Sequence, residues 1–313
     1  MKKIILGATG LEVSDMCLGT MMFGTTVDEK SALSVLDAYF ENGGNFIDTS
    51  NNYAHWAGTG DESETLLGKW LAGHKADRDK LVIATKVGYD RHGLCKGLHR
   101  GNIEYWIDES LRKLGTDYVD LYYAHVDDFS TPLEETMDTL NDLVKKGKVR
   151  AIGCSNYYTW RMEKANEYCR RTGKMPFIVN QQKYSYLFTE NGCEKELPLN
   201  EAAAPEKTSY LASEGIPLVA YSCLLGGGYE DNSRLPDHYV KKGRLAALNE
   251  VAEILGEKPS NVALAYMLNA HRIKGMPRIV PLFSTSKPDH LVGNLKASDI
   301  FLSDELLHKL HKA

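Results

Sequence analysis

The sequence lacks the signals of several large classes of protein. Its longest apolar runs, such as Ile216–Tyr221, fall far short of the ~20 residues that a membrane-spanning helix needs. Acidic side chains outnumber basic ones by 42 to 37, so the chain has no basic excess for nucleic acid or an anionic membrane. With 43% hydrophobic and 25% charged residues among 313, disordered, collagen-like and coiled-coil chains are excluded as well.

Cysteine pairs and metal-ligand clusters are also missing. No C-x-x-C pair and no His/Cys cluster occurs among the six scattered cysteines: Cys17, Cys95, Cys154, Cys169, Cys193 and Cys223. In a chain of this length the pattern predicts free thiols in a reducing compartment and no metal site. The apolar run after Lys2 and Lys3 stops at Gly7, which is too early for a signal peptide. We therefore expect a cytoplasmic protein.

The glycine fingerprint of a Rossmann fold is absent. Gly58-Thr59-Gly60 begins such a motif, but Ser63 stands where the third glycine belongs, and Gly226-Gly227-Gly228 has the wrong spacing. Neither a P-loop nor an H-E-x-x-H motif occurs. We interpret both glycine clusters as loops, and a doubly wound nucleotide-binding domain is disfavoured.

Short apolar segments alternate with amphipathic helical segments along the whole chain. The predicted strands are Met16–Gly19, Asn45–Ile47, Leu81–Thr85, Tyr118–Tyr122, Arg150–Gly153, Phe177–Asn180, Leu218–Tyr221 and Arg278–Pro281. Most are apolar throughout, as in parallel strands that are buried on both faces. Eight such units without a linker predict an α/β protein, a (β/α)8 TIM barrel in one domain over residues 1–313.

The segments outside this alternation help to place a site. Lys3–Leu6 and Leu11–Val13 predict a hairpin that covers the bottom of the barrel. Long loops over Asn52–Glu62, Tyr184–Leu199 and Ser222–Tyr239 are expected on the C-terminal face, where barrel enzymes keep their chemistry. At one predicted helix start, Thr131 with Glu134 resembles a capping box, with Pro132 in the first turn.

Polar side chains follow almost every predicted strand. They are Asp48, Lys86, His125, Ser155 with Asn156, Gln181, Tyr221, and the segment from Ser284 to Lys287. Because the carboxyl ends of barrel strands share one rim, these side chains are expected to gather there. Each has an ordinary structural alternative: the Asp a turn former, the Lys a solvated rim residue, the His a hydrogen-bonded core residue.

Together with Tyr53, three of these residues suit the reduction of a carbonyl group. Hydride delivery to the carbonyl carbon builds negative charge on oxygen, so the site needs a proton donor. A tyrosine beside the ammonium of Lys86 is expected to have a lowered pKa, with Asp48 behind the lysine, and a neutral His125 could orient the carbonyl. A Schiff-base aldolase that uses Lys86 is an alternative.

Eight segments of the sequence together resemble a known family. The segments are Gly43–Tyr53, Ala84–Lys86, Tyr123–Asp128, Thr131–Glu135, Gly147–Asn156, Val179–Tyr184, Val219–Ser222 and Ser284–Asn294. In this order, over nearly the whole chain, they resemble the aldo-keto reductase superfamily. The resemblance implies an NAD(P)H-dependent reductase on a (β/α)8 barrel, with Tyr53 as proton donor, Lys86 and Asp48 tuning it, and His125 orienting the carbonyl.

The same resemblance implies a set of cofactor contacts: Thr20, Asp48, Ser155, Asn156, Gln181, Tyr221, Ser222, Leu224, Gly226, Ser284, Ser286, Lys287, His290 and Asn294. Tyr221 would stack on the nicotinamide, and the last five of these residues would hold the adenosine end. Many NADPH-preferring relatives have a basic residue where Ser284 and His290 stand, and Lys287 is the fixed positive charge of this segment. NADP(H) is therefore favoured and NAD(H) stays open.

The substrate is expected to be a small-molecule carbonyl compound, an aldehyde or ketone, with a sugar-like or otherwise hydroxylated substrate among the options. Trp56 is predicted to line the substrate mouth beside Tyr53 and His125, or else to pack the loop against the barrel. A non-catalytic protein that binds the cofactor as a sensor is the other alternative. No pattern in the sequence specifies an oligomeric state.

Overall fold

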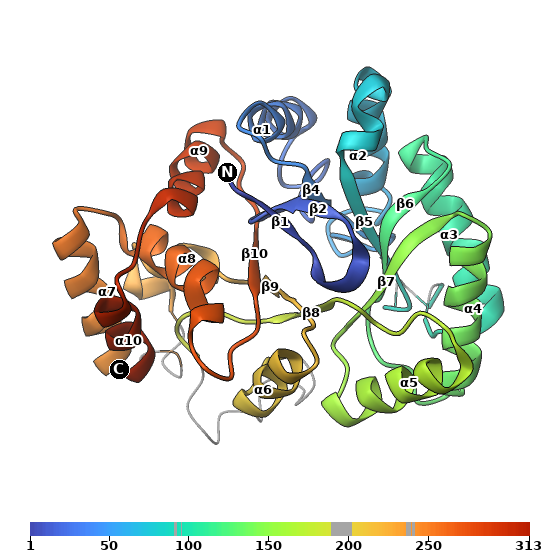
Figure 1. Ribbon diagram of the computed structural model, residues 1–313. Helices are drawn as coiled ribbons and strands as arrows, with labels where there is room; N and C mark the ends of the chain where they lie inside the picture. Colours follow the sequence, from blue (N-terminus) through green and yellow to red (C-terminus); the bar gives the residue numbers. More distant parts are fainter. Residues whose placement is uncertain (91–92, 95, 189–201, 236–238, 240–241) are drawn as a thin grey trace.

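The computed structural model describes residues 1–90, 93–94, 96–188, 202–235, 239 and 242–313. Eight parallel strands close into a barrel in the order β10-β3-β4-β5-β6-β7-β8-β9 (Figure 1). They are β3 (Cys17–Gly19), β4 (Phe46–Asp48), β5 (Val82–Val87), β6 (Val119–Ala124), β7 (Val149–Ser155), β8 (Asn180–Lys183), β9 (Leu218–Tyr221) and β10 (Ile279–Phe283). The predicted (β/α)8 barrel is confirmed.

Helices surround the barrel (Figure 1). They are α1 (Glu29–Glu41), α2 (Glu62–Gly73), α3 (Arg100–Leu114), α4 (Leu133–Lys145), α5 (Thr159–Thr172), α6 (Pro205–Ser213), α7 (Lys242–Leu255), α8 (Pro259–Asn269), α9 (Pro288–Leu295) and α10 (Asp304–Lys312). Between β9 and β10 the chain forms both α7 and α8, and the final helix α10 packs against α7. Within the described part of the chain, no helix is long and apolar enough to cross a membrane.

The strands are buried on both faces because neighbouring residues point to opposite sides. On β5, Val82 and Ala84 face the inside of the barrel and belong to the inner apolar cluster. Ile83, between them, faces outward and joins the outer cluster with Ile103 and Ile107 of α3. This alternation also decides which side chains at a strand's end point into the barrel.

A hairpin closes the amino-terminal end of the barrel. Its strands are β1 (Lys3–Ile5) and β2 (Glu12–Ser14), which pair antiparallel and are drawn across the front of the barrel in Figure 1. Leu6, Leu11 and Val13 are buried and belong to the same apolar cluster as the inward residues of the strands. The predicted hairpin is confirmed, and access to the barrel interior is left to the opposite end.

Local predictions had mixed outcomes. Gly115 ends α3 in the left-handed conformation, with φ 64°, as expected of a glycine after a helix. The capping box at Thr131 is wrong: α4 has no side-chain cap, and the Thr131 hydroxyl donates to Asp128 Oδ2 at 2.6 Å instead. The loop predicted over Tyr184–Leu199 lies partly outside the described residues.

The predicted free thiols are confirmed where the structure describes them. Cys17, Cys154, Cys169 and Cys223 are free and buried. Cys95 and Cys193 lie outside the described residues.

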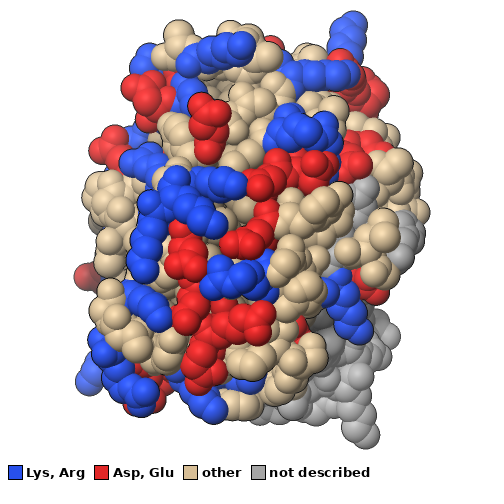
Figure 2. Space-filling view, turned by 90° about the vertical axis from the view of Figure 1, so that its right-hand side faces the viewer, with Lys and Arg blue, Asp and Glu red and all other residues tan. Residues whose placement is uncertain are grey.

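The outer faces of the helices carry interleaved charges. Figure 2 shows acidic and basic side chains side by side on the face over α3, α4 and α5. Arg100 of α3 pairs with Asp142 of α4 at 3.0 Å, and Lys146 pairs with Glu104 at 3.3 Å. Exposed pairs of this kind contribute at most about 1 kcal/mol each, so apolar packing between helix and barrel dominates the stability.

A glycine sets the distance between α2 and α3. A Cβ atom built on Gly68 would lie 2.0 Å from the backbone oxygen of Lys113 on α3, which is inside van der Waals contact. The two helices can therefore pack at this distance only with glycine at position 68.

We predict that Gly68→Ala lowers the free energy of unfolding by about 1–3 kcal/mol, because the methyl group forces the helices apart. Urea unfolding followed by circular dichroism measures this. Gly73→Ala, in the same helix with no atom within 4 Å of its added Cβ, is the matched control. The control should be neutral or slightly stabilising, since alanine favours helix. Equal stability of the two variants would contradict the close contact.

Candidate active site

The site is built at the carboxyl ends of the barrel strands by the alternation described above. Asp48 lies two residues after the inward Phe46, and Lys86 lies two residues after the inward Ala84. His125 follows β6 in the same way, two residues after the inward Tyr123. Side chains two positions apart on a strand share a face, so the polar group follows the apolar one into the barrel.

One carboxylate holds the centre of the site together. Asp48 Oδ1 accepts hydrogen bonds from Lys86 Nζ and from the Tyr53 hydroxyl, each at 2.5 Å. Lys86 Nζ also lies 2.5 Å from the Tyr53 oxygen and 2.8 Å from the Thr49 carbonyl oxygen. Gln181 Nε2 donates to the other carboxylate oxygen of Asp48 at 2.8 Å. Asp48 and Lys86 are fully buried.

The electrostatics of this cluster differ in one respect from the expectation. Burial raises the pKa of Tyr53 well above its usual value, and the negative charge of Asp48 raises it further. The phenol also donates a hydrogen bond to Asp48, which acts in the same direction. Burial likewise lowers the pKa of Lys86, against the opposing effect of Asp48. The expected lowering of the Tyr53 pKa is therefore wrong for this arrangement, because the phenol is buried and because Asp48 touches it directly rather than standing only behind the lysine. The phenol keeps its proton at neutral pH.

His125 lies beside the phenol as a neutral ring. Burial, followed by the charge of Lys86, lowers the pKa of His125 well below its usual value, so the ring is uncharged at neutral pH. The rings of His125 and Tyr53 meet edge to face, with centroids 6.2 Å apart. Its Nδ1 atom lies 3.3 Å from Ser50 Oγ, which in turn donates to Asn52. The contact with Ser50 does not involve the other ring nitrogen of His125, Nε2.

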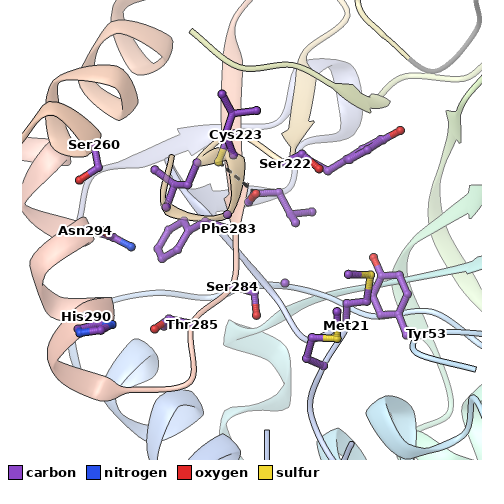
Figure 3. A pocket seen from close by; sticks show the side chains of 18 of the residues that line it. Met21, Tyr53, Ser222, Cys223, Ser260, Phe283, Ser284, Thr285, His290 and Asn294 are labelled. Carbon is purple, nitrogen blue, oxygen red and sulfur yellow. Dashed lines mark hydrogen bonds between the residues drawn. The ribbon is translucent and has the colours of Figure 1, made fainter. Parts of the chain in front are cut away.

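A cavity of about 1020 Å³ opens above the cluster. Of the predicted site residues it is lined by Tyr53, Trp56, His125, Ser155, Asn156, Gln181, Tyr221, Ser222, Leu224, Gly226, Ser284, His290 and Asn294. Figure 3 shows Tyr53 and Met21 on one side of this space and His290 and Asn294 of α9 on the other. The cavity is elongated, with the phenol cluster near one end and the start of α9 near the other.

Five predicted residues, Thr20 among them, do not line the cavity. Asp48 and Lys86 lie beneath the cavity and reach it only through Tyr53 and Gln181. Ser286 and Lys287 are exposed and do not line it.

The prediction of a cofactor contact by Thr20 is not supported by its position. Thr20 is fully buried, its hydroxyl is 2.9 Å from the Asp48 carbonyl oxygen and 2.7 Å from Ser63 Oγ, and it does not line the cavity. Its neighbours Gly19, Met21 and Met22 do. The hydroxyl instead anchors the end of β4 to α2.

The structure adds residues that the sequence reasoning missed. They are Met21, Met22, Asn52, His55, Tyr89, Glu230, Asp231, Arg234, Lys258, Ser260 and Asn261. Lys258 to Asn261 belong to the start of α8, which Glu230 ties to the loop after β9 by accepting from Ser260 N at 3.0 Å. The sequence Lys258-Pro259-Ser260 predicts a helix start, but no pattern in the sequence indicates that this helix start lines the cavity.

The backbone around the cavity is held in unusual conformations. Among the described non-glycine residues, positive φ angles occur at Ala54, Asn156, Ser222 and Leu225, between 49° and 57°. All four follow a barrel strand at its carboxyl end, and the last three line the cavity. Such conformations cost about 1–2 kcal/mol each and gather where a site needs them.

The residues present fit a dinucleotide better than a metal ion. Among the described residues, no group of three His, Cys, Asp or Glu side chains could hold a metal ion. The loop after β9, with positive φ at Gly226 and open space where a Cβ would stand, offers its backbone to a long ligand. The cavity volume also exceeds what a small carbonyl compound alone requires.

Comparisons with known proteins agree with this geometry. The profile of the aldo/keto reductase family matches residues 15–313. A norsolorinic acid reductase of Aspergillus flavus is 33% identical, with 99% of this chain and 80% of that protein covered. The uncharacterized oxidoreductase YrpG of Bacillus subtilis is 33% identical, over 99% of this chain and 95% of its own. An aryl-alcohol dehydrogenase (NADP(+)) of Phanerodontia chrysosporium is 30% identical, over 96% and 83%.

The match of the family profile to nearly the whole chain confirms the resemblance drawn from the motifs. It also agrees with the closed barrel and its amino-terminal hairpin. The chain belongs to the aldo/keto reductase family of oxidoreductases.

Proposed function

We propose that the protein reduces an aldehyde or ketone to an alcohol with NADPH, using Tyr53 as the proton donor. The observation that carries the proposal is the contact of the Tyr53 hydroxyl with Lys86 and Asp48, 2.5 Å from each, below a cavity that Tyr53 itself lines. The relatives named as reductases and as an alcohol dehydrogenase support the same chemistry.

In the reaction, the carbonyl oxygen of the substrate lies between the Tyr53 hydroxyl and the His125 ring. The reduced nicotinamide, when bound, supplies the hydride for the carbonyl carbon. Tyr53 keeps its proton until the oxygen becomes strongly basic and then donates it, which completes the alcohol. Lys86 stabilises the phenolate that remains, and Asp48 holds the ammonium in place. The neutral His125 hydrogen-bonds the oxygen without competing as an acid.

The cofactor would lie along the cavity with its nicotinamide near Tyr53. Ser155, Asn156 and Gln181 supply polar groups for the carboxamide, and Tyr221 offers a ring face. The loop of Ser222, Leu224 and Gly226 would bring backbone close to the pyrophosphate. At the far end Ser284, His290 and Asn294 would hold the adenosine, with Ser286 and Lys287 exposed beside them.

We favour NADPH because positive charge is available at the adenosine end. Lys258 and Arg234 line the cavity, Arg234 in an ion pair with Asp231 at 3.2 Å, in addition to the exposed Lys287 that the sequence indicated. The amino-terminal turn of α8 begins at the same place, and helix amino termini attract phosphate. The 2′-phosphate of NADPH would form charged hydrogen bonds with these groups, and NADH has no phosphate there to do so.

The mouth beside Tyr53 suits an aromatic carbonyl compound. Met21, Met22, Trp56 and Tyr89 surround it, and the ring of Tyr89 lies 5.2 Å from that of His125. Apolar and aromatic walls favour a flat, apolar body over the sugar-like substrate considered from the sequence. The name of the aryl-alcohol dehydrogenase relative supports this choice.

The two alternatives are less well supported. As a Schiff-base nucleophile Lys86 would need a free amine, but its Nζ atom makes three hydrogen bonds and is fully buried. A cofactor sensor without catalysis would not need the short contacts between Tyr53, Lys86 and Asp48.

We predict that Tyr53→Phe lowers kcat for carbonyl reduction by about 10²–10⁴-fold while NADPH still binds, because only the proton donor is lost. NADPH absorbance at steady state and binding by fluorescence measure the two effects. Tyr157→Phe is the matched control: its buried hydroxyl has no hydrogen-bond partner among the described residues and lies outside the cavity. An active Tyr53→Phe enzyme would refute the proton-donor role.

For the cofactor, we predict that NADPH binds more tightly than NADH and that Lys258→Met removes part of the difference. The variant should raise the Kd of NADPH about tenfold and leave that of NADH nearly unchanged, since a charged hydrogen bond to phosphate is lost. Fluorescence titration measures both constants. Lys274→Met changes an exposed lysine that does not line the cavity and serves as control. A parallel loss for both cofactors would exclude a 2′-phosphate contact.

For the substrate, we predict a kcat/KM at least tenfold higher for aromatic aldehydes than for aldoses of similar carbonyl reactivity. Trp56→Ala should reduce this preference by roughly tenfold because the variant removes an aromatic wall. Trp160→Ala is the matched control, since both indoles are similarly exposed, at 61% and 58%, and Trp160 does not line the cavity. A preference for aldoses in the wild type would favour the hydroxylated substrate instead.

A further inference from the structure

Lys207 is a buried lysine that the mechanism above does not use. It lies on α6, and only 3% of its surface is exposed. Its Nζ atom donates to the Tyr157 carbonyl oxygen and, at 3.2 Å, to Gln182 Oε1. Among the described residues no carboxylate lies within ion-pair distance of it. Burial lowers its pKa to about 8, partly opposed by Cys154, Glu206 and Asp127.

A buried ammonium without a carboxylate is costly, so its hydrogen bonds are expected to serve a purpose. An ammonium can only donate, and this settles the orientation of the neighbouring amide. The Gln182 side chain must turn its oxygen toward Lys207 and its nitrogen away. Gln182 Nε2 then faces Asn156 Oδ1, at 3.4 Å.

Asn156 is where this chain of contacts reaches the cavity. Its Oδ1 atom accepts from the Tyr221 hydroxyl at 2.9 Å, and its Nδ2 atom donates to the His125 carbonyl oxygen at 3.0 Å. The same Nδ2 lies 3.1 Å from Ser155 Oγ. One amide therefore links the ends of three strands, and its backbone has a φ of 55°. If the amide turned over, the contacts on both sides would be lost.

We propose that Lys207 is a positioning residue for the cofactor: through Gln182 it holds the Asn156 amide, together with the His125 carbonyl oxygen, in one orientation and, with it, the place of the Tyr221 ring. The proposal rests on the proposed function, in which the nicotinamide binds against Asn156 and Tyr221. Lys207 itself does not line the cavity and touches no reacting group.

The first test is the affinity for NADPH, measured by fluorescence in the absence of substrate. Lys207→Met should raise the Kd and the KM of NADPH roughly tenfold and change kcat less than about twofold, since the reacting groups are untouched. Lys113→Met is the matched control, because the side chain of this lysine is also buried but pairs with Asp61 and, at 3.5 Å, with Glu64, and it does not line the cavity. The control should lower Tm without changing the Kd. An unchanged Kd in a folded Lys207→Met protein would overturn the proposal.

The second variant separates positioning from a purely structural role. Gln182→Glu gives Lys207 a carboxylate partner of the same shape but removes the N–H that faces Asn156. If Lys207 only stabilises the fold, this variant should bind NADPH like the wild type with an equal or higher Tm. We expect instead a Kd raised roughly tenfold with Tm maintained. This variant also covers the case in which Lys207→Met fails to fold.

A double-mutant cycle checks the route. Lys207→Met combined with Gln182→Met should bind NADPH no more weakly than either single variant, because both remove the same orientation of Asn156. Additive losses would overturn a route through Gln182. If the wild type bound no NADPH at all, the proposed function would fail first, and that result is separate from a wild type that binds while the Lys207 variants match it.

Discussion

The structure depends on keeping an ammonium, a carboxylate and a phenol together in a place without water. Asp48 makes this possible, because one of its oxygens accepts from both Lys86 and Tyr53 while Gln181 occupies the other. A buried ion pair is stable only when its remaining hydrogen-bonding groups are satisfied. The parallel barrel provides these partners at the ends of its strands. No additional segment is needed to satisfy the buried polar groups. The same desolvation raises the pKa of Tyr53, so the phenol gives up its proton only to a strongly basic group.

Much of this arrangement follows from two periodicities. Apolar strands that alternate with amphipathic helices predicted the barrel, and Asp48, Lys86 and His125 were predicted to gather at one rim of it. These predictions succeed because the direction of a side chain on a strand is determined by parity alone. Lys86 points inward for the same reason that Ala84 does.

Predictions on loops were poorer, and for a physical reason. The side chains of Lys258 and Met21 reach the cavity from segments whose path depends on tertiary contacts, such as the bond from Ser260 N to Glu230. The hydroxyl of Thr131 bonds to Asp128 instead of capping the helix, because such groups bond to whichever acceptor the fold brings near. The direction of the Tyr53 pKa shift was missed because spacing in sequence reveals neither the burial of the phenol nor its contact with Asp48.

The amino-terminal hairpin affects how small molecules can enter and leave the barrel. Because Leu6, Leu11 and Val13 close the amino-terminal end of the barrel, the cavity formed by the described residues opens at the opposite rim, where Trp56 is exposed. If the proposed cofactor and substrate both enter by this rim, the one that binds deeper would bind first and leave last.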